Sequence, residues 1–86
     1  MQILIEKAAA KYLQSLPVNQ RHLILNGIAG LRTQPPQGDI KPLKGYHDGR
    51  QRLRVGKYRV IFKYDTSGKV TILVIMDVGS RGDIYK

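Results

Sequence analysis

The residues 49–60, GRQRLRVGKYRV, contain the side chains best suited to chemistry with phosphate groups. Four arginines fall in this stretch: Arg50, Arg52 and Arg54 at every second residue, and then Arg59. A guanidinium group keeps its charge at physiological pH and can bind two phosphate oxygens at once. On a strand, alternate side chains are about 6.6 Å apart, which suits successive contacts along a phosphate backbone. The stretch therefore predicts a phosphate-binding face.

The overall charge favours a polyanionic partner. Fifteen Lys and Arg against six Asp and Glu give the 86 residues a formal charge of +9, so nucleic acid, an acidic protein and anionic membrane are the candidates. The absence of cysteine excludes disulfides, thiolate metal sites and thiol nucleophiles. The apolar run at 3–5 is too short for a signal peptide or a membrane span. We expect a soluble, cytoplasmic, single domain over residues 1–86.

The first half of the chain predicts a strand and two helices that would support this face. Residues 3–5 are β-favouring, and Pro17 ends the first helical pattern. Asn19 is the expected N-cap of the second helix. The two apolar stripes consist of Ala9, Tyr12, Leu13 and Leu16, and of Ile24, Gly27, Ile28 and Leu31. The short break between the helices predicts an antiparallel hairpin, and the glycines within the second helix predict close packing there.

The second half predicts an antiparallel meander. Residues 33–49 are rich in Pro and Gly and are expected to form a loop. A two-residue turn at 55–58 would pair Arg54 with Arg59. One face would then be core, and the other a basic surface without interleaved acids, carrying the four arginines and Lys63. The apolar strand at 70–78 belongs in the middle of the sheet. These elements give an α+β fold, β-α-α-β-β-β, in which a helical hairpin packs on one face of an antiparallel sheet.

The order and spacing of several short segments resemble the RelE/ParE toxin superfamily, and most closely its RelE-like mRNA endonucleases. The segments are the first strand, a helical hairpin closing in QSLP, and then KPLKG, RLRVGKYRVIF and the terminal VGSRGDIY. The resemblance implies the toxin of a toxin-antitoxin system that cleaves mRNA in the ribosomal A site and so inhibits translation. It also implies silencing by an acidic antitoxin, bound in a heterodimer or heterotetramer.

The resemblance assigns roles to particular residues. It places Arg50, Arg52, Arg54, Arg59, Arg81 and Tyr85 at site positions, of which Arg52, Arg59, Arg81 and Tyr85 are the catalytic candidates and Arg50 and Arg54 are RNA-binding candidates. Lys44, Lys63 and His47 are added as RNA-binding candidates from their positions beside the arginines, and His47 is also a possible proton carrier. Positions 50 and 52 carry arginine where RelE-like enzymes often have lysine. Arg59 and Arg81 would stabilise charge that develops on the phosphate. Tyr85 is the candidate for proton transfer, since nearby arginines would lower the pKa of its phenol, and it could equally stack on a base.

The acidic residues are scattered without the spacing of a metal site, so we expect a metal-independent reaction that needs no cofactor. Three functions remain open: the endoribonuclease, a ParE-like inhibitor of DNA gyrase on the same fold, and a catalytically decayed, RNA-binding homologue. The plainer alternatives are that the arginine strand is a solvated face and that Arg81 and Tyr85 merely end the sheet.

Overall fold

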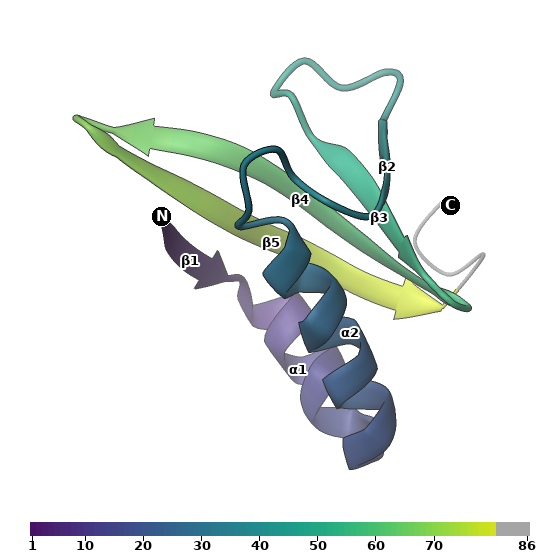
Figure 1. Ribbon diagram of the computed structural model, residues 1–86. Helices are drawn as coiled ribbons and strands as arrows, with labels where there is room; N and C mark the ends of the chain where they lie inside the picture. Colours follow the sequence, from purple (N-terminus) through teal and green to yellow (C-terminus); the bar gives the residue numbers. More distant parts are fainter. Residues whose placement is uncertain (81–86) are drawn as a thin grey trace.

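The computed structural model describes residues 1–80 as two helices packed on one side of a five-stranded sheet (Figure 1). In chain order the elements are β1 (Gln2–Ile5), α1 (Lys7–Ser15), α2 (Val18–Gly30), β2 (Asp39–Pro42), β3 (Gln51–Val55), β4 (Tyr58–Ser67) and β5 (Val70–Ser80). The strand order is β1-β5-β4-β3-β2. Strand β1 runs parallel to β5, and every other pair is antiparallel. The predicted α+β class is confirmed, with a parallel edge strand that makes the sheet mixed.

The helices form the predicted antiparallel hairpin (Figure 1). Helix α1 ends before Pro17, as expected, but the N-cap prediction for Asn19 is wrong. Pro17 occupies the cap position and Asn19 lies inside the first turn of α2, because proline has a fixed φ and no N–H group that needs a partner at a helix start. Arg21 connects the two helices, since its Nε donates to the Leu13 carbonyl oxygen at 3.0 Å.

The predicted close packing of α2 occurs against β3. A Cβ atom at Gly27 would lie 2.7 Å from Val55 Cγ2, inside the van der Waals limit. A Cβ atom at Gly30 would lie 2.9 Å from the carbonyl oxygen of Gln37. Both glycines therefore let neighbouring segments approach the helix, which offsets the helix propensity they lose.

The predicted loop over residues 33–49 is wrong in part, because it contains strand β2. Asp39 to Pro42 pair with β3, and Ile40, opposite Leu53, is half-buried against the core. A four-residue edge strand between prolines and glycines shows no periodicity that a sequence pattern can detect, and an edge strand tolerates proline because one side of it is unpaired.

The β3–β4 hairpin has the predicted register, with Val55 opposite Tyr58 and Leu53 opposite Val60. Gly56 has φ +58°, the positive value that the predicted turn requires. Strand β5 lies between β1 and β4, so its position inside the sheet is also confirmed. The largest fully buried side chains are Phe62, Ile24, Leu31, Leu53, Leu73, Ile75 and Val60. They form one core between the helices and the sheet.

Candidate nucleic-acid interface

The hairpin register brings Arg54 and Arg59 directly opposite each other. Directly paired residues share one face of a sheet, and strand alternation adds Arg52 of β3 and Lys63 of β4 to that face. The core residues of these strands lie on the other face, toward the helices. We call Arg52, Arg54, Arg59 and Lys63 the basic face. Like charges in directly opposed positions destabilise a sheet, so this arrangement is better explained by a function than by stability.

Arg59 is buried, with 5 % of its surface exposed, so its prediction as part of an open surface is wrong. Ile61 and Val74, which alternation puts on the same side of the sheet, are buried as well. The β2–β3 connection, residues 43–50, rises on this side of the sheet, opposite the helices (Figure 1). Alternation in a sequence shows which residues share a face but not how deeply each of them is buried. The result is a guanidinium that is largely shielded from solvent.

Asp39 brings an acid onto the basic face, contrary to the expectation of a face without acids. It lies opposite Arg54 in the β2–β3 register. Its Oδ1 is 3.3 Å from Arg52 Nη1, and its Oδ2 is 3.9 Å from Arg54 Nη1. This acid was not expected because it lies on β2, a strand that the sequence pattern does not reveal. Two of the arginines share one intramolecular anion.

The Arg50 side chain contacts two residues of its own loop, Asp48 and Tyr46. Its Nη2 donates to Asp48 Oδ2 at 2.8 Å and its Nε to Oδ1 at 3.1 Å. The guanidinium carbon also lies 4.1 Å from the centre of the Tyr46 ring. The hydrogen bonds from Arg50 lower the pKa of Asp48 from its ordinary value of 3.8 to about 2, and the charge of Lys63 acts in the same direction. The pair is therefore ionised at every pH at which the protein would act.

The other predicted RNA-binding residues lie in or near the β2–β3 connection, residues 43–50. Lys44 and His47 belong to it and are exposed. Lys63 lies on β4, where its Nζ is 3.6 Å from Asp65 Oδ2. Arg81 and Tyr85, predicted as catalytic, lie outside the described residues. The structure thus brings Arg52, Arg54, Arg59 and Lys63 onto one face, and it brings Lys44, His47 and Arg50 into the β2–β3 connection.

Three side chains of this region were not predicted from the sequence to belong to it: Asp39, Asp48 and Tyr46. Asp48 had a usable signal, since it precedes Arg50 by two residues in a Gly-flanked turn, where aspartate bonds the backbone two residues on. Arg50 N–H indeed donates to Asp48 Oδ1 at 3.2 Å. Asp39 and Tyr46 had no such signal, because their roles depend on a strand pairing and a stacking contact.

Within residues 1–80, no three His, Asp or Glu side chains lie close enough together to hold a metal ion. The helices in this part of the chain are also too short to cross a bilayer. The chemistry available on the basic face is the binding of phosphate oxygens and the stabilisation of negative charge that develops on them.

Neither the family models nor the curated protein sequences yield a match to this chain, whereas solved structures do. The crystal structure of the archaeal RelE-RelB complex from Pyrococcus horikoshii OT3 contains a chain that is 31 % identical, with a TM-score of 0.71. The match covers 95 % of this chain and 96 % of that chain. The RelB-RelE antitoxin-toxin complex from Methanococcus jannaschii matches at 30 % identity and a TM-score of 0.67, over 95 % and 94 % of the two chains.

The toxin-antitoxin complex RelBE2 from Mycobacterium tuberculosis matches at 25 % identity and a TM-score of 0.72, over 93 % of this chain and 96 % of that chain. These matches extend over nearly the whole sequence, so they include the sheet that carries the basic face as well as the helical hairpin behind it. On this basis the chain belongs to the RelE-like toxin superfamily.

Proposed function

We propose that this protein is a metal-independent endoribonuclease that cleaves mRNA in the ribosomal A site and thereby inhibits translation. The observation that carries this proposal is Arg59, a buried guanidinium that lies directly opposite Arg54 on one face of the sheet. A fixed cation in partly desolvated surroundings is what stabilises a phosphate that gains negative charge. The arginine-rich face suits cleavage by the RNA's own 2′-hydroxyl, because guanidinium groups bind phosphate oxygens and stabilise the charge that develops on them.

In this reaction the 2′-oxygen attacks phosphorus, an O2′–P bond forms, and the P–O5′ bond breaks. The 2′-oxygen gives up its proton and the leaving 5′-oxygen takes one, which leaves a 2′,3′-cyclic phosphate and a 5′-hydroxyl. Arg59, with Arg81 and Arg52, stabilises the charge on the phosphate. Tyr85 is the proposed proton carrier, and bound RNA on the ribosome brings the reacting groups into line.

The proposed partner is an acidic antitoxin protein, as in the RelE-RelB complexes that the chain resembles. The formal charge of +9 favours an acidic chain that folds on binding and neutralises the basic face. The complex would be a heterodimer or heterotetramer. A ribosomal target implies a cytoplasmic protein.

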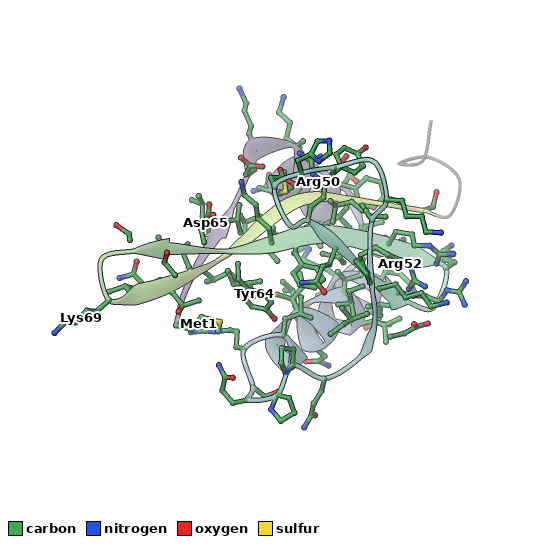
Figure 2. All side chains as sticks on the ribbon, turned by 90° about the horizontal axis from the view of Figure 1, so that it is seen from above. Met1, Arg50, Arg52, Tyr64, Asp65 and Lys69 are labelled. Carbon is green, nitrogen blue, oxygen red and sulfur yellow. The ribbon has the colours of Figure 1, made fainter. Side chains whose placement is uncertain are left out.

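The test is primer extension on ribosome-bound mRNA after brief induction of the toxin, at matched expression. Wild type is compared with Arg81→Ala and Tyr85→Phe, and with Lys69→Ala at the far end of the β4–β5 hairpin as a charge control (Figure 2). We expect cuts within A-site codons that persist in Lys69→Ala and disappear in the other two variants. Growth arrest with intact mRNA would instead indicate a target such as gyrase, and normal growth a decayed toxin.

A further inference from the structure

Tyr46 differs from the other aromatic residues of the described chain. Among residues 1–80 it is the one exposed aromatic side chain, with 51 % of its surface accessible. Tyr58 and Phe62 are buried, and Tyr12 and Tyr64 are half-buried against the core. About half of the Tyr46 surface stays accessible, so packing in the core does not explain its presence.

One face of the Tyr46 ring carries the guanidinium of Arg50, at 4.1 Å from the ring centre. Arg50 does not depend on this contact for its position, because Asp48 binds it through Nε and Nη2. The depressed pKa of Asp48, about 2, keeps that carboxylate charged. The ring therefore lies on a cation that is already fixed by a carboxylate.

The connection that carries this unit is closed at its base, where Leu43 N–H donates to the Arg50 carbonyl oxygen at 3.2 Å. Gly45 and Gly49, at φ +86° and +80°, give the two sharp bends on either side of Tyr46. A ring held in this way loses little conformational entropy when a flat ligand binds to its free face. The surroundings attract polyanions, since Lys44 is exposed in the same connection. This connection rises on the side of the sheet away from the helices (Figure 1), and the basic face is on that side.

We propose that Tyr46, backed by Arg50 and Asp48, is a stacking site for an unpaired base of RNA. Aromatic rings and arginine planes bind single-stranded bases by stacking, with little dependence on sequence. The base comes either from the A-site codon or from ribosomal RNA beside it. The biological source of the base rests on the proposed function, whereas the stacking itself does not depend on it.

The first experiment uses the full chain and a short single-stranded 2′-O-methyl RNA that carries one 2-aminopurine. This RNA lacks the 2′-hydroxyl nucleophile, so binding is measured whether or not the protein is an enzyme. We expect wild type and Tyr46→Phe to quench the 2-aminopurine fluorescence and to bind within twofold of each other. Tyr46→Leu should abolish quenching and weaken binding by about fivefold or more. Val70→Ala, an exposed apolar residue on the β4–β5 hairpin, is the surface control.

Equal quenching and affinity in wild type and Tyr46→Leu would overturn the proposal, as would an equal loss in Tyr46→Phe, which keeps the ring. Thermal unfolding of each variant separates a lost contact from a lost fold. If wild type cleaves no mRNA on ribosomes, the proposed function fails, but the oligonucleotide result still decides the role of Tyr46.

The second experiment distinguishes the two sources of the base. If Tyr46 stacks on the codon, Tyr46→Leu changes the profile of cleaved codons and leaves affinity for ribosomes with an empty A site unchanged. If it stacks on ribosomal RNA, that affinity falls and the codon profile stays the same. A variant that changes neither quantity contradicts a stacking role on the ribosome.

Discussion

Arg52 donates from a single nitrogen, Nη1, to two oxygens of Asp39: the main-chain carbonyl at 3.0 Å and the carboxylate Oδ1 at 3.3 Å. The Arg52 side chain is 12 % exposed, so its position is set by this contact across the β2–β3 pair. The same carboxylate lies 3.9 Å from Arg54. An RNA phosphate that binds these two arginines must therefore compete with an anion that is already present.

Asp39→Asn should increase affinity for single-stranded RNA, because it removes this competing charge while the main-chain carbonyl of residue 39 still accepts from Arg52. The expected gain is between about 1.5-fold and fivefold, the range for an exposed ion pair. It should shrink as salt is added, since salt screens exposed charges. Fluorescence anisotropy with a labelled oligonucleotide over a salt series measures both effects.

The matched control for this prediction is Asp65→Asn, which removes the same charge from the pair with Lys63 (Figure 2). Its effect should be smaller, because within residues 1–80 the ion pair of Asp65 is with Lys63 and not with an arginine of β3. Equal gains in the two variants would show that only net charge matters and that Asp39 has no particular role.

The ion pair of Asp48 and Arg50 should be visible in a pH titration. The pKa of Asp48 is lowered to about 2 by Arg50, below its ordinary value of 3.8. A lowered carboxylate pKa stabilises the folded state above the unfolded pKa, and this contribution is lost as the pH falls through about 2. NMR of the side-chain carboxyl carbons should show Asp48 titrating near 2 in wild type and close to 3.8 in Arg50→Ala.

Arg54→Ala is the control for the titration, since Arg54 pairs with Asp39 rather than Asp48. The Asp48 midpoint should stay near 2 in this variant. An Asp48 midpoint near 3.8 in the wild type itself would mean that the pair with Arg50 does not persist in solution.

The sequence predicted the class of the fold, both helices and the exact partners in the β3–β4 hairpin, because each of these follows from local patterns: helical stripes, a glycine turn and strand alternation. It did not predict the environment of the arginines. Asp39 reaches Arg52 through a strand too short to recognise, and Arg59 is buried, which no pattern on its own strand reveals. Chemistry that depends on pairing between segments is not encoded in the periodicity of either segment.

Gly27→Ala tests the contact between α2 and β3. Alanine favours a helix by about 1 kcal/mol over glycine, yet its Cβ would lie 2.7 Å from Val55 Cγ2. Valine is stiff at χ1 and cannot easily move away, so we expect a net loss of about 1 kcal/mol in the free energy of unfolding. Urea denaturation of the variant and the wild type measures this difference in the free energy of unfolding.

The sign of this effect should reverse when the obstructing methyl group is removed. In a Val55→Ala background, Gly27→Ala should stabilise the protein by roughly 1 kcal/mol, the intrinsic helix preference. Stabilisation by Gly27→Ala in the wild-type background would show that the helix can shift away from β3 without cost.

Tyr64→Phe tests the link between β4 and the end of α2. The Tyr64 hydroxyl donates to the Leu31 carbonyl oxygen at 2.7 Å, and burial raises the pKa of this phenol. The substitution leaves that carbonyl without its side-chain donor, so a loss of about 0.5–1.5 kcal/mol in the free energy of unfolding is expected. Tyr46→Phe, at an exposed ring, should change it by less than about 0.5 kcal/mol. Equal values for the two variants would count against the Tyr64 bond.

Arg59→Lys tests whether the buried guanidinium acts in the reaction. Lysine keeps the positive charge but loses the planar fork that binds two phosphate oxygens. Because position 59 is buried, with Arg59 only 5 % exposed, the shorter lysine side chain has little room to move its ammonium group toward the phosphate. We expect A-site cleavage to fall by about 10²- to 10³-fold, the cost of removing a well-placed donor to a developing oxyanion. Primer extension measures this cleavage.

Arg54→Lys is the matched control, because this arginine faces Arg59 across the hairpin but its side chain is 44 % exposed. An exposed phosphate contact contributes to binding more than to the chemical step, so its cleavage at saturating ribosomes should fall by less than about tenfold. Circular dichroism melting of both variants checks the fold. Wild-type cleavage by a folded Arg59→Lys would mean that burial of this arginine serves the sheet, and that the charge on the phosphate is stabilised elsewhere.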